Sequence, residues 1–412
     1  MRIPFAGAIA LYLITLLADL YIGLDIKNFT APKHRKTWLW VHIVISLLFL
    51  AYLTVIIMLP KRDPEDSVIP VMWMLFSYLS VYLSKLIYCI CSIIGRLVRL
   101  GFRRKSHINY GAMVGLPLAI LVFITIWWGA LFTRYDIETT EVTVESDRLP
   151  ASFDGLKAIQ FSDLHSGTWG NDTSFVSKLV DSINARKPDV IFFTGDIVNR
   201  RSNELDPFLK PLSRLKAPHG VIAIHGNHDY SSYVDWPNPG DMVRDVARLD
   251  SMIRSMGWKL LNNAHTYIVK GNDSIPVIGV ENWGEPPFGQ FGNLHASYAA
   301  SDSTRHVYDD HYKILLTHNP EHWSMAVIDT SNVDLSLAGH THAMQMMIKI
   351  GDWKWSPSKY RYSRWGGMYR ETSKDGRPMD LYVNIGVGEV GFPARIGATP
   401  EITEFTFKST RK

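Results

Sequence analysis

Residues 221–229 read VIAIHGNHD, an apolar and β-branched run that ends in glycine, asparagine, histidine and aspartate. The apolar run predicts a buried strand, and the polar cluster after it contains side chains that bind metal ions. A strand that ends at the edge of a sheet is a rigid support, and the loop after it faces the crevice where ligands bind. The stretch therefore predicts an α/β domain with a ligand site at the carboxyl edge of its sheet.

Outward from this stretch, the same pattern occurs four more times between residues 157 and 342. The five apolar runs and the polar residues after them are 158–162 with Asp163 and His165, 190–194 with Asp196, 221–225 with Asn227 and His228, 313–317 with His318, and 335–338 with His340 and His342. Glycines at 195, 226 and 339 allow the backbone to turn sharply beside these residues. Residues two apart on an extended segment point to the same side, so we expect this of Asp163 with His165 and of His340 with His342.

The donor atoms of this set indicate which ions it can bind. They are carboxylate, imidazole and amide oxygen without thiolate, which suits Mn, Fe, Zn, Ni or Mg rather than a structural zinc site. Seven ligands need two ions. One Asp-x-His or Gly-Asp pair alone is more often a loop feature, and His225 is equally well explained as a core histidine, so the prediction depends on all five clusters together.

In this order, Asp-x-His, Gly-Asp, Gly-Asn-His-Asp, a later His and Gly-His-Thr-His resemble the calcineurin-like metallophosphoesterases, over about residues 149–407. The resemblance implies an αββα sandwich, in which two mixed sheets are flanked by helices. It also implies two divalent metal ions that share Asp196. The first ion would be bound by Asp163, His165, Asp196 and His342, and the second by Asp196, Asn227, His318 and His340.

The implied reaction is hydrolysis of a phosphate ester or anhydride. Two ions about 3.5–4 Å apart lower the pKa of a bridging water, and the resulting hydroxide attacks phosphorus in line. The resemblance implies that His228 binds no metal and contacts the scissile phosphate. We expect Asp229 to orient His228, and Asn227 to connect this group to the metal.

The first third of the chain has a different composition from the rest. Four apolar stretches reach or approach the length of a membrane span, at residues 4–23, 38–59, 68–95 and 111–132. We therefore expect a four-helix transmembrane domain at 1–132 and a metallophosphoesterase domain at 133–412. The net charge is +8 for residues 1–132 and −4 for residues 133–412, so the basic excess reports on membrane topology, and we expect no nucleic-acid partner.

The loops between these stretches indicate orientation. The first and third loops are rich in Lys and Arg, which the positive-inside rule places in the cytoplasm. The predicted protein is then multi-pass, with an extracytoplasmic catalytic domain, periplasmic in a bacterium. Asp19 and Lys85 lie at similar depth in their helices, and we expect a buried ion pair between them, with a proton or ion path as the alternative.

Towards the C-terminus the chain resembles the exported or membrane-bound members of the family, which have Gly-Gly-Gln after Gly-His-Thr-His. Here the residues are Ala343, Met344 and Gln345, a departure that concerns substrate shape. Residues 353–370 interleave aromatic and basic side chains, which suits a membrane interface. Trp355, Arg361 and Trp365 are therefore candidates for membrane or substrate contact, and a solvent-facing aromatic hairpin is the alternative.

These observations predict a membrane-anchored phosphodiesterase or pyrophosphatase that acts on a lipid-linked or membrane-proximal substrate. One alternative resembles the UDP-diacylglucosamine pyrophosphohydrolases, whose substrate lies on the cytoplasmic side. Another is a membrane signalling or scaffolding protein that keeps its metals for structure. Segments 230–258 and 284–310 carry no motif, and we expect them to be lids over the site.

Overall fold

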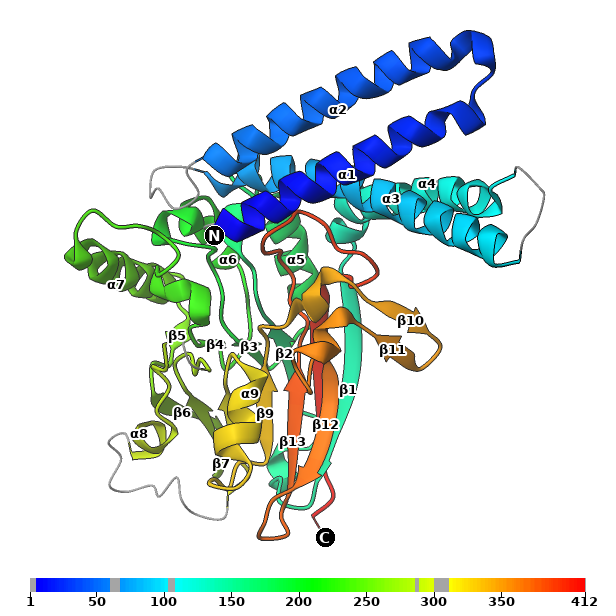
Figure 1. The fold of residues 1–412 in the computed structure, drawn as a ribbon. Helices are drawn as coiled ribbons and strands as arrows, with labels where there is room; N and C mark the ends of the chain where they lie inside the picture. Colours follow the sequence, from blue (N-terminus) through cyan, green and yellow to red (C-terminus); the bar gives the residue numbers. More distant parts are fainter. Residues whose placement is uncertain (1–4, 60–66, 103–107, 286–288, 300–310, 412) are drawn as a thin grey trace. The chain divides into compact units, whose positions relative to one another are not determined.

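A computed structural model describes the chain except for residues 1–4, 60–66, 103–107, 286–288, 300–310 and 412 (Figure 1). Its contacts divide the chain into two compact units. The helical unit is Met1–Leu131 with Gly391–Ala394, and the sheet unit is Phe132–Val390 with Arg395–Lys412.

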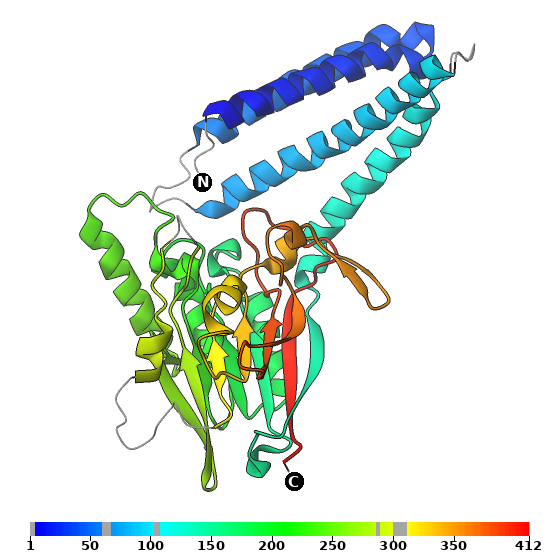
Figure 2. The same ribbon diagram turned by 60° about the horizontal axis from the view of Figure 1, so that its bottom comes forward.

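The helical unit contains four long helices, and α1 packs beside α2 as α3 does beside α4 (Figures 1 and 2). They are α1 (Phe5–Phe29), α2 (Arg35–Met58), α3 (Val68–Gly101) and α4 (Tyr110–Leu131). All four are long and apolar enough to cross a membrane. Their outward side chains are apolar and exposed, with Leu17 at 65% and Leu24 at 70%, as expected of surfaces that face lipid. The prediction of four transmembrane helices is confirmed.

Polar side chains connect α1 to α3 inside this unit. Lys85 Nζ lies 2.7 Å from Asp19 Oδ1, which confirms the predicted ion pair, and Tyr82 donates to the other carboxylate oxygen at 2.8 Å. A second carboxylate, Asp25, is buried and accepts from Tyr88 at 2.6 Å and from Arg96 at 2.5 Å. An unpaired charge in lipid is costly, so these pairs allow α1 to carry two carboxylates through an apolar environment.

The sheet unit is built on two mixed six-stranded sheets. The first has the order β1 (Glu138–Ser146), β14 (Glu401–Ser409), β2 (Lys157–Phe161), β3 (Val190–Phe193), β4 (Val221–Ala223) and β5 (Lys259–Leu260). The second has the order β12 (Gly367–Thr372), β13 (Pro378–Val383), β9 (Leu335–Ala338), β8 (Ile314–Leu316), β7 (Asp273–Gly279) and β6 (Ala264–Lys270). Strands β2, β3 and β4 pair in parallel, as do β7, β8 and β9.

The two sheets pack face to face across one apolar core. Alternate residues of β3 show the arrangement, because Val190 and Phe192 enter the core between the sheets whereas Ile191 and Phe193 enter a second core under the helices. Both faces of the strand are therefore buried, which explains its continuous apolar sequence. This is the predicted αββα sandwich, and the predicted fold class is confirmed.

Helices cover the outer face of the first sheet. The helices of the sheet unit are α5 (Ser174–Ala185), α6 (Leu209–Leu212), α7 (Pro239–Ser255), α8 (Leu294–Ala299) and α9 (Pro320–His322). Within segment 230–258, α7 buries Leu249, Met252 and Ile253 in the core, so this part is packed scaffold instead of the expected lid. Segment 284–310 lies partly outside the described residues. A hairpin of β10 (Ile348–Ile350) and β11 (Trp353–Trp355) belongs to neither sheet.

Candidate metal centre

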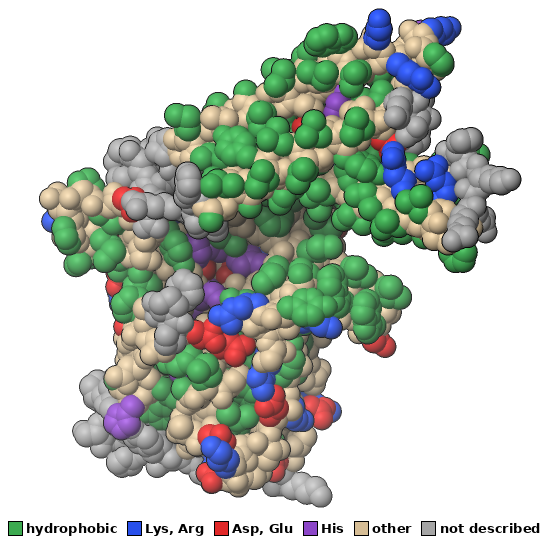
Figure 3. Space-filling view, viewed as in Figure 1, with side chains coloured by type: hydrophobic (Ala, Val, Ile, Leu, Met, Phe, Trp, Pro, Cys, Tyr) green, Lys and Arg blue, Asp and Glu red, His purple; other side chains and the backbone are tan. Residues whose placement is uncertain are grey.

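The predicted ligand residues follow the carboxyl ends of five strands. Asp163 and His165 follow β2, Asp196 follows β3, and Asn227 follows β4 in the first sheet; His318 follows β8, and His340 and His342 follow β9 in the second. Because β2, β3 and β4 are parallel to one another, as are β8 and β9, the loops of each sheet emerge at one edge. Histidine side chains gather beside acidic ones on this unit in the space-filling view (Figure 3).

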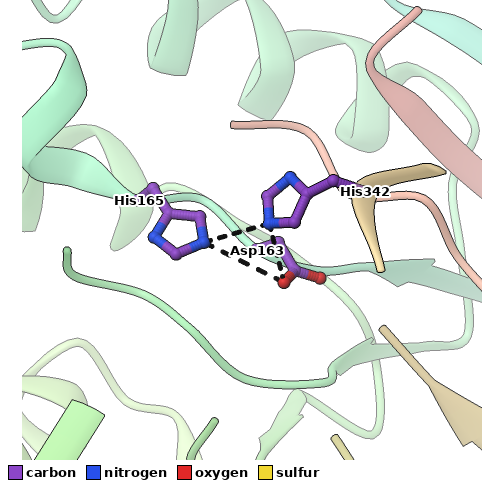
Figure 4. Close-up of side chains that lie close together, drawn as sticks. All are labelled: Asp163, His165 and His342. Atoms are coloured by element: carbon purple, nitrogen blue, oxygen red, sulfur yellow. Dashed lines mark hydrogen bonds and ion pairs between the residues drawn. The ribbon is translucent and has the colours of Figure 1, made fainter. Parts of the chain in front are cut away.

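Three of these side chains converge on one point (Figure 4). His342 Nε2 lies 3.1 Å from Asp163 Oδ1 and 3.1 Å from His165 Nε2, and the Asp163 and His165 atoms are 4.0 Å apart. All three residues are buried. Three donor atoms turned towards one another in this way form a cage for a cation.

A second group consists of Asp196, His318 and His340. His318 Nε2 lies 3.1 Å from Asp196 Oδ2 and 3.2 Å from His340 Nδ1. The same Asp196 oxygen lies 3.6 Å from His165 Nε2, a member of the first group. Asp196 therefore stands between the two groups, as the resemblance implied for the shared ligand.

The spacing of these atoms fits divalent ions. Ligand atoms about 2.1 Å from one ion in tetrahedral or octahedral geometry lie about 3.0–3.4 Å from one another, close to the distances found here. Asn227 supplies an independent indication, because its Nδ2 donates to Tyr233 Oη at 2.7 Å while its buried Oδ1 has no hydrogen-bond partner in the described part of the chain. An amide oxygen in that state suits a metal. The cluster and the donor chemistry together indicate a divalent metal centre.

The pKa shifts of the clustered side chains agree with a site that binds a cation. Burial would raise the pKa of Asp163, but the neighbouring imidazoles His342 and His318 hold it below its usual value. Burial lowers the pKa of both His318 and His340. Asp196 nevertheless raises the pKa of His318 to about 9. The pKa of His340 falls to about 3, because burial and the neighbouring His318 both lower it. A protonated His318 thus compensates part of the charge of the two buried carboxylates, a role that a divalent cation can also fill.

His228 forms a third group with His165 and Asp196, in which one ligand atom of each residue lies within 4.8 Å of the others. Its Nδ1 lies 2.6 Å from the Asn199 carbonyl oxygen, so Nδ1–H donates there, and its ring is stacked on Tyr233 with centroids 4.2 Å apart. Its backbone N–H donates to Asp196 Oδ1 at 2.8 Å. These contacts leave Nε2 as the atom available to a substrate.

The expectation that Asp229 orients His228 differs from the structure. The Asp229 carboxylate accepts backbone N–H groups of Asp196 at 2.8 Å, Ile197 at 2.9 Å, Val198 at 3.2 Å and Gly226 at 2.9 Å. Burial and the charge of Asp196 raise its pKa to about 6. Asp229 thus fixes the loops after β3 and β4, and a backbone carbonyl orients the imidazole.

The expectation that residue pairs two apart point to one side is wrong for His340 and His342, which belong to different groups. The cause is the backbone, because Asp163, His165, Asp196, His340 and His342 all have positive φ, between 45° and 75°. Left-handed residues do not alternate as extended ones do, and such strain collects at functional sites.

Two glycines are required by close approach. A Cβ at Gly226 would collide with Asp196 Oδ1, and one at Gly339 would collide with Asp163 Oδ2. In contrast, Ala343 and Met344 are not glycines and still adopt φ of 50° and 46°. Such a conformation costs a non-glycine residue roughly 1–2 kcal/mol.

Sequence reasoning missed three residues that hold the ligands. Tyr233 positions Asn227 and His228, and Tyr362 Oη lies 3.0 Å from His340 Nε2. Arg395 is fully buried with Nη2 3.3 Å from His342 Nδ1, and it donates to the carbonyls of Gly388 and Ile385. No local pattern marked these residues as partners of the ligands.

The residues predicted to contact membrane or substrate, and His225, lie in different surroundings in the structure. Trp355 lies on the β10–β11 hairpin, Arg361 pairs with Glu285 beside Tyr362, and Trp365 packs against a small apolar cluster under the loop after β9. His225 is buried, pairs with Asp250 at 3.1 Å and joins neither group, as a core histidine would.

Comparison with known proteins identifies relatives of both parts of the chain. Residues 156–344 match the family described as calcineurin-like phosphoesterase, and residues 1–134 match one described as the probable transmembrane domain of such proteins. An uncharacterized metallophosphoesterase of Bacillus subtilis, YkuE, is 31% identical over 281 residues, which cover 66% of this chain and 86% of that protein.

A Danio rerio protein described as a transmembrane protein with metallophosphoesterase domain is 26% identical over 380 residues, covering 90% of this chain and 80% of its own. Among solved structures, a dimetal phosphatase from Danio rerio aligns with a TM-score of 0.33 and 12% identity, covering 57% of this chain and 89% of its own.

The two glycine positions give the first prediction. Gly226→Ala should lower turnover at least about 100-fold and weaken metal binding, because a Cβ there displaces the Asp196 carboxylate and misplacement by about 1 Å costs that much. Met344→Gly is the matched control and should retain activity, since it relieves a left-handed residue. Metal content by mass spectrometry and steady-state rates check both, and a fully active Gly226→Ala protein would refute the close approach.

The role of Asp229 gives the second prediction. Asp229→Ala should lower the apparent Tm by at least about 5 °C, because four buried N–H groups lose their acceptor and each unsatisfied group costs about 1–3 kcal/mol. His228→Gln should leave the Tm within about 2 °C of the parent, since His228 is only partly buried. Differential scanning calorimetry distinguishes them; an unchanged Tm for Asp229→Ala would mean that the carboxylate does not hold the loops.

Proposed function

The chain belongs to the calcineurin-like phosphoesterases, and from this premise we propose that it is a phosphodiesterase or pyrophosphatase acting on a lipid-linked or membrane-proximal substrate. The family and the chemistry of the site indicate a membrane-anchored, metal-dependent phosphoesterase. Membership of an enzyme family also argues against the scaffolding alternative.

The observation that carries the proposal is the position of Asp196. One of its carboxylate oxygens faces His318 and His165, which belong to different ligand groups, and the other accepts the backbone N–H of His228. A carboxylate in this position would be shared by two divalent ions and would fix His228 relative to both. We therefore assign Asp163, His165, Asp196 and His342 to one ion and Asp196, Asn227, His318 and His340 to the other.

Bound divalent ions would supply a nucleophilic water at neutral pH and would neutralise charge on the phosphoryl group. The residues of the chain supply orientation and protons. His228 Nδ1–H is held by the Asn199 carbonyl, which directs Nε2 towards the position of a leaving oxygen. Tyr233 stacks on that ring and holds the amide of Asn227, so that both groups keep one orientation.

The membrane anchor supports the choice of substrate. Four helices long enough to span a bilayer precede the sheet unit, so the chain tethers the sheet unit to lipid. Arg361, next to Tyr362 at the His340 side of the site, is our candidate for contact with further anionic groups of the substrate. We also propose a multi-pass topology with the sheet unit outside the cytoplasm, on the basis of the basic first and third loops.

A substrate panel tests the chemistry. The purified protein with Mn should hydrolyse a phosphodiester or a lipid diphosphate faster than phosphomonoesters or nucleotide sugars. His228→Gln should lower kcat about 10²–10⁴-fold, because it removes a proton donor, whereas His295→Ala, an exposed histidine of α8, should have no effect. Equal rates for the parent and His228→Gln would contradict the assignment.

Topology has its own test. In a variant with Cys89 and Cys91 replaced by alanine, Asp375→Cys in an exposed turn of the sheet unit should react with a membrane-impermeant maleimide in intact bacterial spheroplasts. Lys33→Cys, in the first loop, should react only after permeabilisation. The reverse pattern would favour the cytoplasmic pyrophosphohydrolase-like alternative.

A further inference from the structure

We propose that the β10–β11 hairpin is a membrane-docking element whose apolar face enters the headgroup region of the bilayer that holds the four helices. The inference requires that the helices are membrane spans, and it is independent of which phosphate the enzyme cleaves. Of the aromatic and basic segment 353–370, the proposal concerns only the part in β11, because Trp365 and Arg361 have partners within the sheet unit.

The register of the hairpin separates its side chains by chemistry. Ile348 pairs with Trp355, and Ile350 pairs with Trp353, while Lys349 pairs with Lys354 between them. Successive residues of a strand point to opposite faces, so one face carries four large apolar side chains and the other carries two lysines. Ile350 is 69% exposed and Trp353 56% exposed, in a hairpin that belongs to neither sheet.

The lysine face is turned towards the rest of the sheet unit. Lys349 Nζ lies 3.2 Å from Glu138 Oε1 at the start of β1. The Glu138 carboxylate also accepts from Thr399, and this hydrogen bond together with Lys349 and Lys354 holds its pKa below the usual value. Because Glu138 anchors the lysine face, the apolar face is directed outward (Figure 3 shows hydrophobic side chains at the place of this hairpin).

Such a hairpin is poorly suited to exposure to water. Isolated two-stranded hairpins are marginally stable, and two lysines directly opposite each other repel. Exposed isoleucine and tryptophan add an unfavourable apolar surface. At a bilayer surface each of these features becomes favourable, since tryptophan prefers the interface and lysines are attracted to anionic headgroups.

The covalent connection to α4 favours a bilayer over another protein as the partner of the hairpin. Glu138, the anchor of the hairpin, follows the last residue of α4, Leu131, by seven residues. Seven residues span at most about 25 Å even when fully extended. The attachment point of the hairpin therefore stays within about 25 Å of the end of a membrane helix, whatever the arrangement of the two units.

A pair of labelled positions tests the proposal in the full-length protein. In the variant without Cys89 and Cys91, Ile350→Cys or Lys354→Cys is labelled with the fluorophore NBD, and the protein is reconstituted into nanodiscs that contain phosphatidylglycerol. The two positions lie on opposite faces of the same hairpin, so Lys354→Cys is the matched control. Trp353→Cys repeats the first position if Ile350→Cys is poorly folded.

We expect nitroxide-labelled lipid to lower the fluorescence at position 350 at least twofold and to affect position 354 much less, while iodide in solution quenches the label at 354 more strongly. Iodide quenching of equal strength at both positions would overturn the proposal. Protection of position 350 from iodide without quenching by nitroxide lipid would also overturn it, because the occupant would then be protein. None of these readings requires turnover, so a failure of the proposed reaction leaves the test intact.

Discussion

The site depends on one carboxylate that is assigned to no metal. Asp229 accepts four backbone N–H groups, three from residues 196–198 after β3 and one from Gly226 after β4. These hydrogen bonds fix two loops against each other, and the loops carry Asp196, Asn227 and His228. Without this internal acceptor, the N–H groups would be buried and unsatisfied, and the shared position of Asp196 between two ligand groups would not be defined.

Much of this arrangement follows from local sequence. The apolar runs predicted β2, β3, β4, β8 and β9 to within two residues, because a strand buried on both faces needs a continuous apolar sequence. The ligand types after each strand are equally visible. The direction of each side chain was not predictable, because left-handed φ at His340 and His342 is imposed by the loop and its neighbours. Asp229 illustrates the limit, since it adjoins His228 in sequence and yet bonds to another loop.

In the helical unit, too, local sequence did not show how buried charges are compensated. Hydropathy predicted four helices, but placed the end of the first at residue 23, whereas α1 continues to Phe29 and includes Asp25. The partner that makes this possible, Arg96, lies on α3, 71 residues away in the chain. Contacts of this range also explain why Tyr362 and Arg395 could not be recognised as partners of the ligand histidines. Sequence patterns report local order, and the compensation of buried charge is a tertiary property.

Strand β14 has a consequence for how the protein is made. It follows the other strands of the two sheets along the chain, and it lies between β1 and β2, pairing in parallel with the first and antiparallel with the second. The first sheet therefore cannot be completed until residues 401–409 have been synthesised. Helices α1 to α4 can enter a membrane early in translation, whereas the sheet unit must wait for residues 401–409 before β1 has any strand partner. The order of synthesis thus places every candidate metal ligand before the strand that joins β1 to β2.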